Sequence, residues 1–142
     1  MPVINRSALV MYSAQQMYDL VNDVQAYPQF LDGCVGVDLL EQSDTHMLAR
    51  LHLRKAGLSY QFVTRNQLQA PDAIALELEQ GPFEHLHGKW HFTALREDAC
   101  KVEMQLDFAI SGLAGKALGG LFSQVAGNMV DAFCQRAEQV YE

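Results

Sequence analysis

The sequence is poor in cysteine and in basic side chains. Its three cysteines, Cys34, Cys100 and Cys134, are widely spaced and form no Cys-x-x-Cys pair, which argues against a disulfide framework and a thiolate zinc knuckle. Ten Lys and Arg residues against seventeen Asp and Glu give a net charge of -7. Because non-specific nucleic-acid binding needs basic side chains that displace phosphate counterions, we expect no generic DNA or RNA binding.

No targeting or membrane-spanning segment stands out. The N-terminus has no cationic segment followed by an apolar stretch, so we expect no secretory signal and a cytoplasmic location. Residues 108–130 carry only Lys116 as a charge, but five glycines and several polar residues interrupt them. We therefore expect this stretch to lie in a folded domain rather than in a membrane.

Catalytic and metal-binding motifs are also missing. The sequence has no Gly-x-Ser-x-Gly elbow and no cysteine with a plausible local base, so we expect no catalytic residue and no enzyme. His85, His87 and His91 share one face of a predicted strand with Lys89. A metal site there would need a further carboxylate or thiolate and groups that orient the rings. We predict a solvated histidine face, no metal and no required cofactor.

The first thirty residues combine one strand with two short helical segments. Alternation of apolar residues predicts a strand over residues 3–11. Ser13 with Gln16 forms a capping box, which predicts a short helix over residues 14–22. Pro28 then interrupts the chain, and the large apolar residues beside it indicate a second short turn of helix.

The rest of the chain has a period of two and then a helical period. Apolar alternation predicts six strands, around residues 35–40, 47–54, 58–65, 74–79, 85–92 and 101–110. Short polar turns join them, which predicts an antiparallel meander with one dry and one wet face. From Leu113 to Tyr141 the spacing predicts one helix, about 43 Å long at 1.5 Å per residue. Only a sheet of similar width can bury this helix, so we predict a single α+β domain over residues 1–142.

Several local strings of residues resemble one known family. They are Asn22-Asp23-Val24, Tyr27-Pro28-Gln29-Phe30-Leu31, Gly81-Pro82-Phe83, Gly88-Lys89-Trp90 and Asp107-Phe108. With the order of the predicted elements, they resemble the coenzyme-Q-binding START-like group of the polyketide cyclase/SRPBCC family over essentially the whole chain. The resemblance implies the helix-grip (Bet v-like) fold. In this fold a curved antiparallel sheet of about seven strands wraps around a long C-terminal helix, with two short helices after the first strand.

The resemblance implies two alternative roles, neither of them catalytic. The first is binding of ubiquinone or a related isoprenoid lipid in an internal cavity, as a carrier or chaperone that supports respiration and transiently contacts the inner membrane. The second is that of a bacterial toxin in this group, which binds the large ribosomal subunit and blocks subunit association. A third role, polyketide cyclase or aromatase, needs an acid or base in the cavity, and the sequence indicates none. The same fold occurs in carriers and in enzymes, so only the residues of the site can distinguish these roles.

The large side chains that are predicted to point inward define a candidate cavity. They are Tyr27, Phe30, Tyr60, Phe62, Thr64, Phe83, Leu86, Trp90, Met104, Phe108, Leu118, Phe122, Val125 and Met129. These residues either form an ordinary core or line an apolar pocket, in which methionine would adapt to a flexible isoprenoid tail. Tyr60, Thr64 and Asn66 are the polar members of the inner face. They would either hydrogen-bond a quinone head group or cap the end of the core.

One concentrated basic patch is present. Arg50, Arg54, Lys55 and Arg65 cluster around one predicted hairpin, and we expect them on its outward face. The patch is either a solvated surface or a docking surface for anionic lipid head groups or ribosomal RNA.

Overall fold

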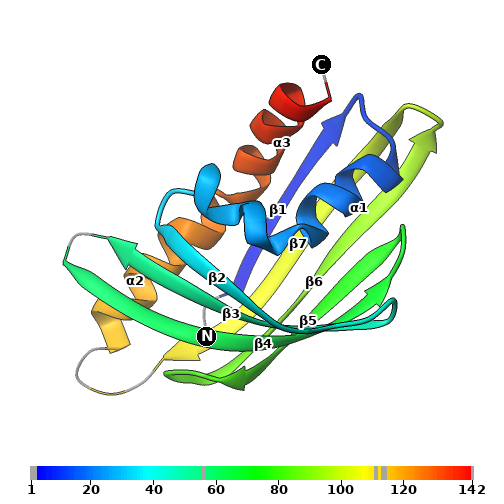
Figure 1. Cartoon of the computed structure of the whole chain (residues 1–142). Helices are drawn as coiled ribbons and strands as arrows, with labels where there is room; N and C mark the ends of the chain where they lie inside the picture. Colours follow the sequence, from blue (N-terminus) through cyan, green and yellow to red (C-terminus); the bar gives the residue numbers. More distant parts are fainter. Residues whose placement is uncertain (1–2, 56, 111, 113–114, 142) are drawn as a thin grey trace.

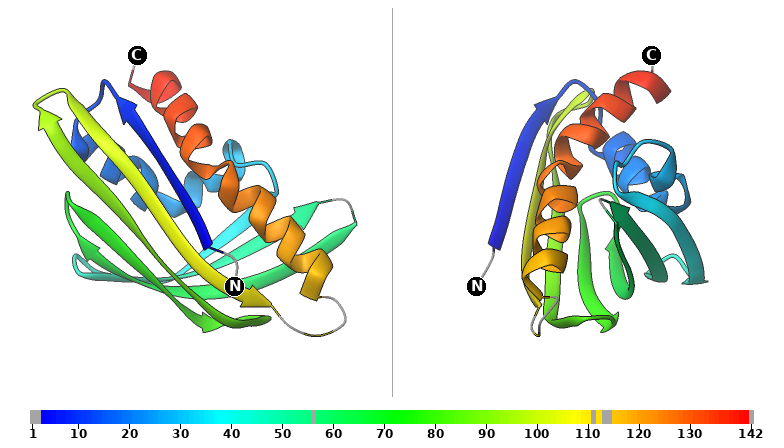
Figure 2. Two further views of the ribbon diagram at one scale, coloured as in Figure 1. Left: turned by 180° about the vertical axis from the view of Figure 1, so that it is seen from behind. Right: turned by 90° about the vertical axis from the view of Figure 1, so that its left-hand side faces the viewer.

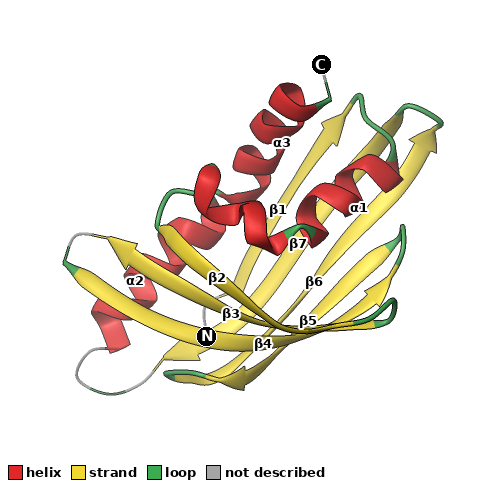
Figure 3. Ribbon diagram, in the orientation of Figure 1, coloured by secondary structure: helices red, strands yellow, loops and turns green. Residues whose placement is uncertain are grey.

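The fold is a strand, two short helices, six strands and two further helices in sequence order (Figures 1 and 3). The structure is a computed structural model that describes residues 3–55, 57–110, 112 and 115–141. The elements are β1 (Val3–Val10), α1 (Ala14–Asn22), the 3-10 helix η1 (Val24–Gln29), β2 (Cys34–Gln42), β3 (His46–Lys55), β4 (Leu58–Gln69), β5 (Ala73–Gln80), β6 (Phe83–Arg96), β7 (Ala99–Ile110), α2 (Gly115–Gly127) and α3 (Met129–Val140).

The seven strands form one antiparallel sheet in the order β1-β7-β6-β5-β4-β3-β2. From β2 to β7 every strand pairs with the next one along the chain, as a meander requires, and β1 completes the sheet by pairing with β7. The sheet is strongly curved, and α2 and α3 lie across its concave side (Figure 2). The predicted α+β architecture with a gripped C-terminal helix is therefore confirmed.

The two short helices begin where the sequence predicted. The Ser13 hydroxyl accepts a hydrogen bond from the Gln16 backbone N–H at 3.0 Å, and the Ser13 N–H donates to the Gln16 side chain at 2.8 Å. Pro28 lies inside η1. Helix α1 contacts α3, β6 and β7, while η1 contacts β2. These contacts place both helices over one part of the concave face, beside α3 (Figure 1).

The predicted long C-terminal helix is confirmed, with one interruption along its length. The helix is divided into α2 and α3 at Asn128, whose backbone has φ -99° and ψ -3°. The Asn128 N–H donates to the carbonyl of Val125, three residues back, at 3.3 Å. Gly127 precedes it, and both glycine and asparagine are weak formers of helix interiors. The predicted start at Leu113 lies outside the described residues.

The strands bury one face, as the alternation predicted. In β7, Val102, Met104, Leu106 and Phe108 are all buried. The alternation fails at the start of β2, where a bulge after Cys34 leaves Val35 57% exposed. In the described part of the chain, no helix is long and apolar enough to cross a membrane.

Candidate functional site

A small cavity lies between the concave face of the sheet and the helices. Its volume is about 70 Å³. Seven of the predicted cavity residues line it: Tyr27, Phe62, Thr64, Leu86, Trp90, Phe122 and Met129. The wall also contains residues that the sequence analysis did not select: Val21, Asn22, Val24, Ala49, Leu51, Asn66, Ile74, Leu76 and Leu106. Asn66 was predicted only as a polar residue of the inner face.

The other seven predicted residues lie around the cavity without lining it. Phe83, Met104, Phe108 and Val125 are buried, whereas Phe30, Tyr60 and Leu118 are half-buried. The alternation of side chains along each strand correctly predicted which strand residues face inward. It could not separate the side chains that pack against each other from those that face the remaining space, because that depends on how far each ring reaches across the concave side.

An aromatic cluster packs where Phe62 and Phe122 line the cavity. The ring of Phe122 lies 4.6 Å from that of Phe108 and 5.0 Å from that of Phe83, measured between centroids. Phe62 joins the cluster at 5.3 Å from Phe83. All three contacts are edge-to-face, the favoured geometry for aromatic pairs. This part of the cavity wall is therefore tightly packed and apolar.

A second aromatic cluster packs where Tyr27 and Trp90 line the cavity. The ring of Phe133 in α3 lies 5.3 Å from Tyr27 and 5.4 Å from Trp90. The Tyr27 hydroxyl donates a short hydrogen bond to the carbonyl of Val21, and burial raises the pKa of Tyr27. Tyr27 therefore fixes η1 against α1 and offers the cavity the face of its ring rather than a free hydroxyl.

The size of the cavity limits what it holds in this conformation. Small-molecule pockets commonly span roughly 300–1,000 Å³, whereas one water molecule occupies about 30 Å³ in the liquid. A cavity of about 70 Å³ is thus far smaller than an isoprenoid quinone. Leu51, Leu76 and Met129 are half-buried apolar members of its wall.

Polar groups enter this apolar wall at three positions. Thr64 and Asn66 on β4 are each 5% exposed, and Asn22 at the end of α1 is half-buried. The Nδ2 group of Asn66 donates to the sulfur of Met47 at 3.9 Å. The Oδ1 atoms of Asn66 and Asn22 are both buried and have no hydrogen-bond partner within the described residues. Asn22 belongs to a string that resembles the family, but it was not predicted as a cavity residue, because only the packing of α1 on the sheet brings it to the cavity.

Tyr60 has a different position from the other predicted polar residues. It lies in the aromatic cluster, with its ring 6.1 Å from Phe62 and 6.2 Å from Phe83, and does not line the cavity. Its hydroxyl is buried without a partner among the described residues, and burial raises the pKa of this group.

The predicted basic patch is largely paired with carboxylates. Arg50 lies 3.4 Å from Asp38, and Lys55 lies 2.6 Å from Asp32. Lys55 has the opposite strand parity to Arg50 and Arg54, so it does not share their outward face. Within the described residues, exposed Arg54 makes no ion pair.

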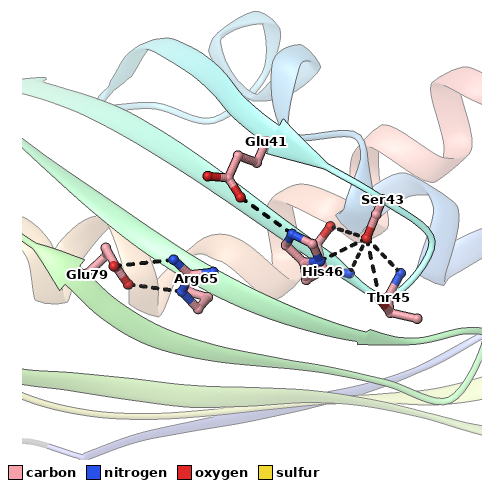
Figure 4. Close-up of polar contacts among 6 residues, drawn as sticks. All are labelled: Glu41, Ser43, Thr45, His46, Arg65 and Glu79. Atoms are coloured by element: carbon pink, nitrogen blue, oxygen red, sulfur yellow. Dashed lines mark hydrogen bonds and ion pairs between the residues drawn. The ribbon is translucent and has the colours of Figure 1, made fainter.

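Arg65 is the fourth residue of the predicted basic patch. It lies 3.1 Å from Glu79 on the neighbouring strand, as Figure 4 shows. The hydrogen bond from Arg65 holds the pKa of Glu79 below its usual range. The same close-up shows the polar turn between β2 and β3, in which Ser43 accepts hydrogen bonds from the backbone N–H groups of Thr45 and His46. The outward face of β3 and β4 is therefore a network of ion pairs with Arg54 as its uncompensated charge.

The histidines of β6 share an exposed face with Asp107 of β7. His85 lies 3.0 Å from Asp107, and His87 lies 3.7 Å from the other carboxylate oxygen. The hydrogen bond with His85 lowers the pKa of Asp107. In the described part of the chain, no three His, Cys, Asp or Glu side chains are arranged to hold a metal ion.

These observations define a class of protein. A curved antiparallel sheet that grips a C-terminal helix around a small apolar cavity is a START-like helix-grip domain. The chain belongs to the polyketide cyclase/dehydrase and lipid transport family, whose model matches residues 10–134.

Two relatives are informative. The ribosome association toxin RatA of Escherichia coli K12 is 51% identical over 142 residues, which cover 99% of this chain and 90% of the relative. The mitochondrial coenzyme Q-binding protein COQ10 homolog B of Xenopus laevis is 26% identical over 142 residues, which cover 96% of this chain and 58% of the relative.

Solved structures share the fold. The Zhui aromatase/cyclase from Streptomyces sp. R1128 superposes with a TM-score of 0.86 at 19% identity and covers 99% of this chain and 96% of its own. A START superfamily protein from Mycobacterium smegmatis gives a TM-score of 0.81 at 23% identity, covering 97% and 98%. At these identities the likeness shows the architecture alone.

Proposed function

We propose that this chain acts by binding rather than catalysis, and that it associates with the large ribosomal subunit and hinders subunit joining. The observation that carries the proposal is the 51% identity over 99% of the chain to a relative named as a ribosome association toxin. A shared fold alone constrains mainly the core. Identity over half of all positions extends to the surface, where a macromolecular partner would bind.

The proposed contact surface is the outward face of β3 and β4. It carries Arg50, Arg54 and Arg65, and Arg54 is exposed and makes no ion pair among the described residues. Phosphate oxygens of ribosomal RNA would compete with Asp38 and Glu79 for the two paired arginines. Such contacts release counterions, so binding should weaken steeply with salt.

The experiment is co-sedimentation of the purified chain with large ribosomal subunits at increasing salt. We expect the double variant Arg50→Glu/Arg54→Glu to lose binding by about tenfold or more, because it reverses two charges on the proposed face. The matched control is Arg96→Glu/Lys101→Glu, which reverses two charges on β6 and β7 and should leave binding unchanged. Absence of co-sedimentation, or equal loss in both variants, would refute the proposed contact.

The cavity favours a second role, binding of a small apolar molecule such as ubiquinone or a related isoprenoid. Its support is a largely apolar wall with few polar groups, together with a distant relative named as a coenzyme Q-binding protein. Because the cavity is small in this conformation, a ligand of this size would need its wall to rearrange. The two roles are compatible, and a bound ligand could regulate the ribosomal one.

Trp90 provides a direct test of this second role. It is the chain's only tryptophan and lines the cavity, so a bound quinone should quench its fluorescence. We expect saturable quenching by a short-chain ubiquinone, lost in Phe122→Asp and kept in Leu95→Asp, whose site is 57% exposed. Mass spectrometry of lipid extracted from freshly purified protein would identify the natural ligand. If the purified protein contains no lipid and binds no added quinone, the second role is refuted and the aromatic residues form an ordinary core.

The third role, a cyclase or aromatase, has weaker support in the cavity. Among the described residues, the only titratable side chain in its wall is Tyr27, whose hydroxyl donates to the carbonyl of Val21. Burial also raises the pKa of the thiols of Cys34, Cys100 and Cys134, which disfavours the nucleophilic thiolate. We therefore propose no catalytic role.

A further inference from the structure

Two amide oxygens on the cavity wall accept no hydrogen bond from the described residues. They are Oδ1 of Asn66, on β4, and Oδ1 of Asn22, at the end of α1. Asn66 is 5% exposed, so bulk water does not reach it freely. Buried polar groups in folded proteins nearly always have a partner, which makes two such atoms in one cavity a feature that points to a ligand.

The orientation of the Asn66 amide is fixed by its neighbour. The Nδ2 group donates to the sulfur of Met47 at 3.9 Å. A thioether sulfur only accepts hydrogen bonds, so reversing the amide would place two acceptors against each other. The group that Asn66 leaves unpaired is therefore an acceptor, and its partner must be a donor.

We propose that the cavity selects ligands whose apolar head carries a hydroxyl, such as a phenol or a hydroquinone, over heads of similar shape that carry only carbonyl or ether oxygens. This inference rests on the proposed ligand-binding role. Thr64 also lines the cavity, but its hydroxyl both donates and accepts and therefore discriminates little. The two asparagine oxygens only accept, and they set the preference.

Water explains how this selectivity operates. A cavity of about 70 Å³ has room for a water molecule, which can donate to either oxygen once the amide turns toward that space. A ligand that displaces such water must replace its hydrogen bonds, or it loses affinity. A hydroxyl replaces them, whereas a carbonyl or ether oxygen leaves the two amide oxygens unpaired.

The test compares two small probes on the unmodified chain. p-Cresol carries a hydroxyl, and 4-methylanisole carries an ether oxygen on the same ring. Each is titrated while the methyl resonances of the protein are followed by NMR. We expect p-cresol to bind about tenfold more tightly, a factor typical of one additional buried hydrogen bond.

Variants assign the preference to its residue. Asn66→Leu keeps a similar side-chain size and removes the acceptor, so the ratio of the two dissociation constants should fall to about one. Thr64→Val is the matched control on the same strand and should keep most of the preference. If Asn66→Leu does not fold, Asn22→Leu provides a second test. We expect this variant to lose part of the preference for p-cresol over 4-methylanisole.

The outcomes separate this inference from the role on which it rests. Equal binding of both probes overturns the selectivity while leaving ligand binding intact. Binding of neither probe at millimolar concentration overturns both. A preference that survives in both Asn66→Leu and Asn22→Leu overturns the assignment to the amide oxygens.

Discussion

Asn66 is the residue at which the proposed binding role predicts a cost in stability. Its amide lies among apolar residues, with one weak contact to Met47 and one unpaired oxygen. A buried acceptor without a partner costs about 1–3 kcal/mol in folded stability. An apolar residue at this position would avoid that cost, so the polar residue is best explained by a role in recognition.

Replacement of this asparagine should therefore stabilise the ligand-free protein. For Asn66→Leu we expect the free energy of unfolding to rise by about 1 kcal/mol, or roughly 2–4 °C in Tm. Asn5→Leu, at an exposed site on β1, serves as the control and should change Tm little. Thermal unfolding followed by circular dichroism measures both, and a lower Tm for Asn66→Leu would mean that the amide is structurally required.

Asp107 adds a dependence of stability on pH. Its pKa is below the ordinary value because of the hydrogen bond with His85, with charge attraction from His85 and His87 adding to the effect. A carboxyl with a lowered pKa in the folded state stabilises the protein above its unfolded pKa of about 4. This stabilisation is lost as the pH falls below that value through the lower folded pKa.

Asp107→Asn should accordingly be less stable than the unmodified chain at pH 7, with a difference that shrinks below about pH 4. Denaturant unfolding at pH 7, 5 and 3 would measure it. Asp44→Asn in the exposed β2–β3 turn is the control, since Asp44 makes no ion pair within the described residues. A difference that does not change with pH would show that the charge of Asp107 contributes nothing.

At the level of secondary-structure elements, β6 and β7 contribute Leu86, Trp90 and Leu106 to the cavity wall. Gly88 on β6 lies opposite Leu106 on β7. A Cβ atom at Gly88 would lie 2.2 Å from a methyl group of Leu106 and 2.7 Å from the carbonyl oxygen of Gln105. Because Leu106 lines the cavity, the glycine provides the space that this side chain occupies.

Gly88→Ala should therefore destabilise the protein and perturb the cavity together. We expect a loss of about 1–3 kcal/mol, typical of overpacking against a backbone atom that cannot move freely. Gly119→Ala in α2 is the control, because an added Cβ there meets nothing within 4 Å. Gly119→Ala should be neutral or slightly stabilising by helix propensity. Urea unfolding compares the two, and equal stability would show that β6 and β7 can separate.

At the scale of the whole molecule, the two proposed partners use different surfaces. The ribosomal contact lies on the outward face of β3 and β4, whereas the ligand lies on the inner face of the same strands. Ala49 of β3 lines the cavity and is fully buried, while its neighbour Arg50 points outward. The two proposed binding surfaces therefore lie on opposite faces of the same strand.

Ala49→Val tests whether the two surfaces are coupled. The added methyl groups fill part of the cavity, so we expect weaker quinone quenching of Trp90 and unchanged or higher Tm. Co-sedimentation with the large ribosomal subunit should stay unchanged if the roles are independent. A parallel loss of ribosome binding, without a lower Tm, would instead show that occupancy of the cavity regulates the outer face.

The sequence by itself determined the elements and which of their faces are buried. The two-residue period of the strands and the capping box at Ser13 are local properties of the chain, because side chains alternate across a strand and a cap involves residues three apart. The tertiary structure decided the rest. The pairing of Arg50 and Arg65 with carboxylates, and the meeting of Asn22 with Asn66 at one cavity, bring together segments that no local pattern connects. The shape of the cavity likewise depends on which rings fill the concave face, and this is settled only when distant side chains pack together.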